Sequence, residues 1–104
     1  GLHILVKYMK GSKRGDLISL VDNLKTVYAD SLIVFVGEEN GTLPVVVSCS
    51  QAAIAKGNKA GDIVRSVAQA LGGSGGGRPE MASGAGKDNT KVDEALASAK
   101  AMIK

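Results

Sequence analysis

The chain has 104 residues, of which 44% are hydrophobic and 22% charged, so its size and composition are those of one globular domain with a modest core. Its only aromatic residues are two tyrosines and one phenylalanine, which argues against single-strand recognition by rows of stacked aromatic side chains. One cysteine excludes an intramolecular disulfide and a cluster of thiolate metal ligands, and no apolar run reaches the length of a membrane span.

The net charge of +3 is unevenly distributed along the chain. Residues 1–14 carry four cations and no acid, residues 15–50 one cation and five acids, and residues 51–104 eight cations and five acids. If the two basic ends meet in space they form one basic face, for which a polyanion is the natural partner. The alternative is that these cations are separate, solvated surface residues.

The first part of the chain predicts a strand, a helix and a second strand. Residues 2–9 are aliphatic and β-branched, which favours a strand, and the basic segment 10–15 is expected to be a turn. Apolar residues at helical spacing predict a helix over 16–28. The second strand covers 30–39, and its apolar middle is typical of a strand buried on both faces.

The middle of the chain predicts a hairpin followed by a connection. Asn40 and Gly41 are a strong hairpin-turn pair, and the valine-rich segment 43–50 predicts the third strand. Residues 51–59 are expected to connect this strand to the next helix.

The last part of the chain predicts two helices on either side of a glycine-rich loop. The helices cover about 59–71 and 90–104, with Thr90 as the expected N-cap of the second. The loop covers 72–86 and includes a short strand within 80–86. The order β-α-β-β-α-glycine-rich loop-(β)-α predicts a compact single α/β domain with a mixed sheet and about three helices.

Seven of the fifteen residues from 72 to 86 are glycine, which needs a reason because glycine weakens helix and strand interiors. The P-loop pattern fails because Asp88 follows Gly86-Lys87, and the G-x-G-x-x-G pattern fails because Arg78 stands where its third glycine is required. Bare backbone flanked by Arg78 and Lys87 can approach a flat partner closely and offer N–H groups to phosphate oxygens. The alternative is a long connection whose glycines only supply positive φ angles.

Candidate catalytic groups are few. His3 is the only histidine and Cys49 the only thiol, and a surface histidine and a packed small side chain are expected in preference to a nucleophile–base pair. Glu38 and Glu39 are neighbours on a predicted strand, so they point to opposite faces and do not converge. No residues have metal-ligand spacing. We therefore expect no catalytic residue, metal or cofactor in this chain.

The segment AGDIVRSVAQALGGSGGGRPEMASGAG, residues 60–86, resembles the end of the C-terminal domain (C-Ala) of alanyl-tRNA synthetases, which is a member of the DHH-associated nucleic-acid-binding domain family. The shared pattern is a helix with an early Ala-Gly, then Gly-Gly-x-Gly-Gly-Gly-x-Pro-x-x-Ala and a Gly-x-Gly pair before the last helix. Phosphoesterase relatives usually carry a histidine in or just after the glycine run, where this chain has Arg78-Pro79-Glu80. This points to the synthetase branch.

The resemblance implies a tRNA-binding domain, residues 1–104, that is not itself an enzyme and is part of a longer cytoplasmic alanine–tRNA ligase. Such a domain docks on the tRNA elbow and assists aminoacylation and editing that other domains carry out. Its implied partners are alanine tRNA and the rest of the synthetase chain, with no cofactor and no membrane. The alternatives are a protein-interaction or self-association module, such as a homodimer, and a general nucleic-acid-binding domain that also accepts DNA.

The residues expected to contact nucleic acid form two groups. Those carried over by position in the family pattern are Gly73, Gly75, Gly76, Gly77, Arg78, Pro79, Gly84 and Gly86, with Lys87 placed to meet phosphate. Those chosen from charge alone are Lys10, Lys13, Arg14 and Lys59.

Overall fold

A mixed sheet of five strands, in the order β1-β2-β3-β5-β4, forms the centre of the computed structural model, which describes residues 2–104. The strands are β1 (His3–Met9), β2 (Ser31–Gly37), β3 (Leu43–Cys49), β4 (Ser74–Gly77) and β5 (Met81–Gly86). β1 and β2 are parallel, and the other neighbouring pairs are antiparallel. The predicted α/β class with a mixed sheet is confirmed.

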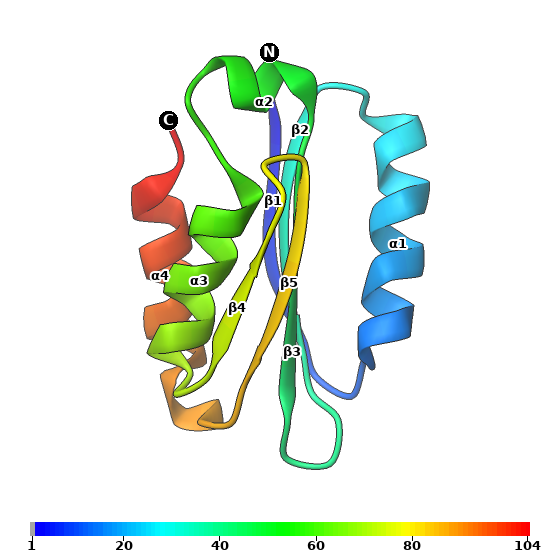
Figure 1. Ribbon diagram of the computed structural model, residues 1–104. Coiled ribbons are helices and arrows are strands. Elements are labelled where there is room, and N and C mark those ends of the chain that lie inside the picture. The colour runs from blue at the N-terminus through cyan, green and yellow to red at the C-terminus, as the bar shows by residue number, and fades with distance from the viewer. Residues whose placement is uncertain (1) are drawn as a thin grey trace.

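Helices cover both faces of the sheet (Figure 1). The helix α1 (Arg14–Val27) lies on one face, α3 (Ala60–Ala70) and α4 (Val92–Met102) lie on the other, and the short α2 (Gln51–Ala55) lies at one end. A 3-10 turn, η1 (Asn89–Lys91), leads into α4. None of the helices in residues 2–104 is long and apolar enough to cross a membrane.

The hydrophobic core has two parts because the sheet separates them. On one side, Leu17 and Val21 of α1 pack with Ile33, Phe35 and Val46 of β2 and β3. On the other side, the alternate residues of the same strands pack with α3 and α4 in a larger cluster. All residues of β2 and β3 are buried, as the apolar sequence of these strands predicts.

The two helical layers do not cover the same strands. α1 packs on β2 and β3, whereas α3 packs on β3, β4 and β5. The α1 side of β4 and β5 is therefore left without a covering helix, and the candidate site lies on this side.

Two predicted boundaries are wrong. α1 begins at Arg14, inside the expected basic turn, and its first turn is supported by Asp16, whose carboxylate accepts a hydrogen bond of 3.2 Å from the Lys13 backbone N–H. The expected connection 51–59 contains α2, because Ser50 caps this helix by accepting a hydrogen bond from the Ala53 N–H at 3.3 Å.

The expected N-cap of the last helix is also wrong. The Asp88 carboxylate accepts the Thr90 N–H at 3.0 Å and so starts η1, and α4 begins only at Val92. A carboxylate placed two residues before Thr90 thus supplies the cap that the sequence reading assigned to the threonine hydroxyl.

The expected glycine-rich loop is mainly a β-hairpin, formed by β4 and β5. Ser74–Gly77 form β4, at the edge of the sheet, and pair with β5 from Ser74↔Ala85 to Gly77↔Ala82. The short strand expected within 80–86 is confirmed as β5. Glycine disfavours strands, but here the ladder with β5 and the packing of α3 outweigh that preference.

Candidate nucleic-acid interface

The uncovered side of β4 and β5 forms a groove beside the start of α1. The groove consists of two adjoining hollows, of about 400 Å³ and about 340 Å³, and both are lined by Arg14 and Ser83. The hairpin hollow lies beside the β2–β3 hairpin, and its other lining residues are Glu39, Thr42, Pro44, Ser74, Gly75, Gly84 and Ala85. The turn hollow lies beside the β4–β5 turn, and its other lining residues are Ile18, Gly76, Gly77, Arg78, Met81 and Ala82.

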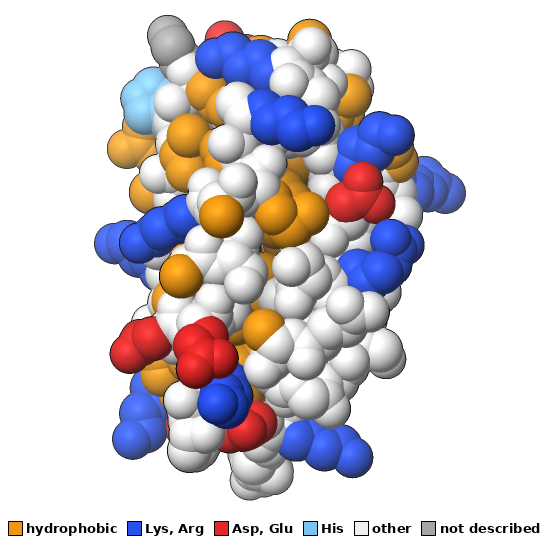
Figure 2. Space-filling view, turned by 90° about the vertical axis from the view of Figure 1, so that its left-hand side faces the viewer, with side chains coloured by type: hydrophobic (Ala, Val, Ile, Leu, Met, Phe, Trp, Pro, Cys, Tyr) orange, Lys and Arg blue, Asp and Glu red, His pale blue; other side chains and the backbone are white. Residues whose placement is uncertain are grey.

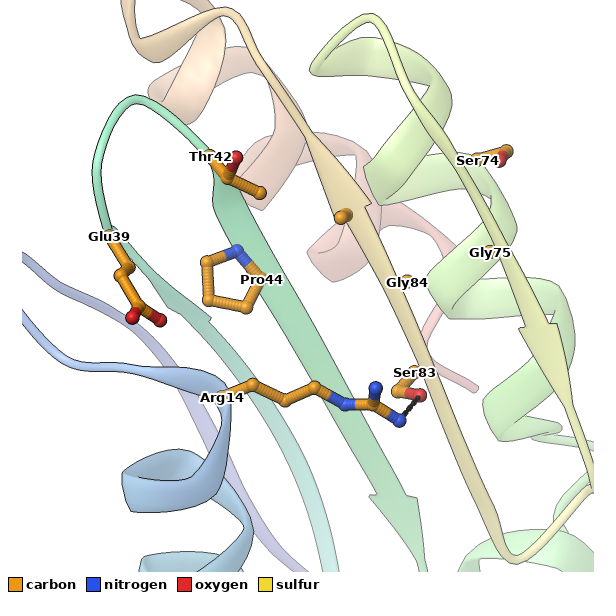
Figure 3. Close-up of a pocket in the computed structure, with 9 residues that line it drawn as sticks. Arg14, Glu39, Thr42, Pro44, Ser74, Gly75, Ser83 and Gly84 are labelled. Carbon is orange, nitrogen blue, oxygen red and sulfur yellow. Dashed lines mark hydrogen bonds between the residues drawn. The ribbon is translucent and has the colours of Figure 1, made fainter.

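Arg14 crosses the groove between the two hollows. Its side chain extends from the first residue of α1 over β3, and one guanidinium nitrogen donates a hydrogen bond of 2.9 Å to the Ser83 Oγ on β5 (Figure 3). A guanidinium has five N–H donors, so this single bond leaves others free for phosphate or for base edges. Arg14 thus contributes a cation to the middle of a surface that otherwise has few side chains.

Most glycines of the run are required by the fold. A Cβ on Gly75 would lie 2.8 Å from the Gly84 Cα, and a Cβ on Gly84 would lie 2.7 Å from the Gly75 Cα, because these residues face each other across the hairpin. An added Cβ would also come within 3.0 Å of other atoms at Gly73, Gly77 and Gly86. Gly72 has a φ of +77°, a backbone conformation that residues with a Cβ rarely adopt.

Gly76 is the exception in this run. A Cβ built on it would meet no atom within 4 Å, and its φ lies outside the left-handed region. Gly76 pairs with Ser83, whose hydroxyl is on the groove side, so the missing side chain keeps that side of β4 flat. Packing in this chain does not require a glycine here, and a glycine at this position would let a ligand approach the backbone closely.

Six of the predicted site residues lie together on the groove. They are Gly75, Gly76, Gly77, Gly84, Arg14 and Arg78. The Arg78 side chain is 85% exposed and its contact with Glu80 is long, at 3.9 Å, so its charge remains available to a ligand.

The remaining predicted residues do not line either hollow. A Cβ on Gly73 would collide with the Ala85 backbone, and a Cβ on Gly86 with Leu71. The Pro79 carbonyl accepts the Ala60 N–H at 2.9 Å. Lys87 follows β5 and donates its backbone N–H to Leu71. The lysines chosen from charge are also outside the groove lining: Lys10 and Lys13 precede α1, and Lys59 precedes α3.

The α3–α4 side of the molecule is not the continuous basic face that the two basic ends of the chain would form if they met, and it fits the alternative of separate surface cations. On the α3–α4 side, Lys and Arg side chains are spaced apart and acidic side chains lie among them (Figure 2). In the groove itself, the charged lining residues are Arg14, Arg78 and Glu39, so its positive character comes from two guanidinium groups.

Sequence reasoning missed several groove residues, among them Ser74, Ser83, Thr42 and Glu39. The alternation of Met81, Ser83 and Ala85 along β5 is a signal for the side of the strand that faces the groove, but it is useful only once β5 is assigned as a strand.

The structure supports no catalytic role for the two residues first considered. The His3 ring stacks on Tyr28, with 4.4 Å between ring centroids. Cys49 is buried in the larger core, and burial raises the pKa of its thiol to about 11, so it is not a ready nucleophile. Among residues 2–104, no three His, Cys, Asp or Glu side chains are arranged to hold a metal ion.

Comparison with known proteins decides the family, because the DHHA1 domain pattern matches residues 1–104. The chain belongs to the DHHA1 domain family. The alanine–tRNA ligase of Shouchella clausii is 38% identical over 97 residues, which are 93% of this chain and 11% of the ligase. That of Leptospira borgpetersenii serovar Hardjo-bovis is 42% identical over 89 residues, 85% of this chain and 9% of the ligase.

A solved structure has the same fold as this DHHA1 domain. The crystal structure of the C-Ala domain from the Aquifex aeolicus alanyl-tRNA synthetase superposes with a TM-score of 0.82 at 25% identity, covering 98% of this chain and 89% of that one. The chain thus spans about a tenth of the ligases it matches and nearly all of an isolated C-Ala domain. The resemblance to C-Ala noted in the sequence is confirmed.

Proposed function

We propose that this DHHA1 domain binds tRNA as an accessory domain of an alanine–tRNA ligase. The observation that carries the proposal is the groove on β4 and β5, where Gly76 has no side chain although the fold leaves room for one. The alanine–tRNA ligase relatives are much longer, and the chain matches about a tenth of each of them. We therefore infer that the domain is one part of such a ligase.

In the proposed complex, a flat surface of the tRNA lies against the flat glycine side of β4 and β5. Proteins recognise folded RNA mainly through its shape, its stacked bases and its backbone. The outermost base pair of the tRNA elbow is a flat surface that can lie against the glycine side of β4 and β5. Arg14 and Arg78 then lie in the middle and at one end of the groove, where each can donate charge-assisted hydrogen bonds to phosphate oxygens.

This role requires no chemistry from the domain itself. Charging of the tRNA and removal of wrong amino acids would belong to other domains of the ligase, and the DHHA1 domain would hold the tRNA while they act. The domain would need no cofactor of its own, and the cytoplasm, where tRNA is charged, would be its location.

A salt titration of binding tests the proposal. The 104-residue chain is titrated with alanine tRNA, with the same tRNA carrying substitutions that open the elbow, and with a duplex DNA of similar length. We expect tightest binding to the intact tRNA, with an affinity that falls as salt rises. Equal binding to all three would indicate a general polyanion surface, and binding to none would favour a protein-interaction role.

A further inference from the structure

The two edge strands of the sheet differ in what they offer to a partner. β4, at one edge, has four residues, all serine or glycine, so it presents no apolar side chain. β1, at the other edge, has seven residues, of which five are aliphatic, aromatic or methionine. Edge strands are usually protected by charges, proline, a bulge or short length, whereas β1 has one lysine, no proline and an unbroken register with β2. β1 is therefore a strand to which another strand can be added.

The backbone of β1 shows which of its polar groups are open. The His3 N–H donates to the Asp30 carbonyl at 3.0 Å, which is the β2 side of the strand. Since backbone polar groups alternate in direction along a strand, every second residue from His3 also faces β2. The residues between them present their N–H and C=O groups to the open edge of the sheet: Ile4, Val6 and Tyr8. Outside the sheet ladder, no backbone hydrogen bond of these three residues is found within residues 2–104.

The side chains of β1 are also incompletely covered. Every residue of β2 is buried, but no residue of β1 is, and Ile4 is 48% exposed. Val6 and Tyr8 lie on the same face of the strand as Ile4 and are only partly buried against the larger core. Hydrophobic side chains are visible next to the pale-blue histidine, at the left-hand edge of Figure 2. An added strand would cover this apolar row and satisfy the open backbone groups.

The sequence of β1 is complementary to itself. When two copies pair antiparallel about Val6, Ile4 of one copy lies opposite Tyr8 of the other, a favourable aromatic–β-branched pair. The outward N–H and C=O groups of these residues then form the hydrogen-bonded pairs of an antiparallel ladder. Lys7, the only lysine of β1, lies opposite Leu5 of the other copy, so no like charges meet.

The ends of β1 favour the antiparallel direction. Lys10 follows the strand and Asp30 adjoins its start, and both residues are exposed. Antiparallel pairing places Lys10 of each copy at the start of the strand of the other copy, near Asp30. Parallel pairing would place the two lysines side by side, where they repel each other.

We propose that β1 is the contact strand of a symmetric homodimer, in which two copies of this chain pair antiparallel about Val6 and join their five-stranded sheets into one. The groove on β4 and β5 lies toward the other edge of each sheet, so the dimer leaves it open and the proposal does not depend on tRNA binding. A single pair of strands gives a small interface, so association is weak and depends on protein concentration.

Two substitutions of one residue test the proposed register. Leu5→Glu and Leu5→Lys remove the same side chain and add opposite charges, each opposite Lys7 of the second copy. Sedimentation equilibrium of the 104-residue chain at several concentrations measures the dissociation constant. We expect the unsubstituted chain to dimerise, and Leu5→Lys to associate roughly tenfold more weakly than Leu5→Glu, because the pairing occurs twice in the dimer. Gln69→Glu and Gln69→Lys, at an exposed position on α3, control for net charge and should associate equally.

Amide hydrogen exchange of the unsubstituted chain locates the contact. As concentration rises, the amides of Ile4, Val6 and Tyr8 should gain protection, because they become donors in the new ladder. A chain that stays monomeric at millimolar concentration would overturn the proposal. Equal association of Leu5→Glu and Leu5→Lys would exclude this register, and protection gained elsewhere would mean that another surface forms the dimer. Amide spectra check that the variants are folded, and the exchange experiment decides the question even where they are not.

Discussion

A Cβ at Gly76 would meet no atom within 4 Å, whereas a Cβ at Gly75 would lie 2.8 Å from the Gly84 Cα. Substitutions at these two neighbouring residues therefore distinguish an effect on binding from an effect on folding. We predict that Gly76→Ala leaves the free energy of unfolding unchanged or raises it by up to about 1 kcal/mol, because alanine restricts the unfolded chain more than glycine does. The same change should weaken tRNA binding, because the methyl group would stand on the groove floor.

Gly75→Ala is the matched control. It should lower the free energy of unfolding by about 1–3 kcal/mol, as expected when extra volume is forced into a packed position. Urea unfolding and tRNA binding, measured on both variants, provide the comparison. If Gly76→Ala binds tRNA as well as the unsubstituted chain does, the groove floor is not the contact surface.

At the scale of elements, the close packing of α3 on the sheet depends on Gly61. A Cβ on this residue would lie 2.8 Å from the Gly77 carbonyl oxygen, so its absence allows the helix to approach β4 closely. In a helix interior, alanine is ordinarily preferred to glycine by about 1 kcal/mol. We predict that Gly61→Ala nevertheless destabilises the domain by about 1–3 kcal/mol, because helix and strand would have to move apart.

Gly15 provides the comparison for this prediction. It also lies in a helix, in the first turn of α1, but a Cβ there would meet nothing within 4 Å. Gly15→Ala should therefore be neutral or stabilising by up to about 1 kcal/mol. Thermal and urea unfolding of the two variants measure the difference, and a stabilising Gly61→Ala would show that α3 has room to shift.

The elements differ in how far the sequence could predict them. β2 and β3 follow from their apolar runs, and α3 from its apolar spacing, because burial on a fixed period leaves a pattern in the residues. β4 leaves no such pattern, since its sequence is Ser-Gly-Gly-Gly and a strand of glycines has no side-chain alternation. Its pairing with β5 and its contact with α3 are tertiary facts, which local preference cannot show.

The sequence predicted only part of the candidate site, because local patterns do not show which segments the fold brings together. The sequence pattern of residues 72–86 indicates the glycines and Arg78, and the charge of Arg14 indicates that residue. Glu39 and Thr42 were not found because the β2–β3 hairpin is brought beside the groove only by the sheet order β2-β3-β5-β4. The lysines chosen from charge alone do not line either hollow, since charge along a chain does not fix which side of the fold a residue occupies.

At the scale of the whole molecule, the proposed tRNA binding should depend more on the two guanidinium groups in one groove than on the net charge of +3. We predict that Arg78→Gln lowers by about 1 the slope of the logarithm of tRNA affinity against the logarithm of salt concentration, because one phosphate contact releases about one counterion. Lys100→Gln removes the same charge from an exposed position on α4, on the opposite side of the sheet, and should leave the slope unchanged. The measurement is a tRNA titration of each variant at several salt concentrations. An equal fall in slope for the two variants would mean that tRNA responds only to total charge, and the groove would then lose its place as the docking surface.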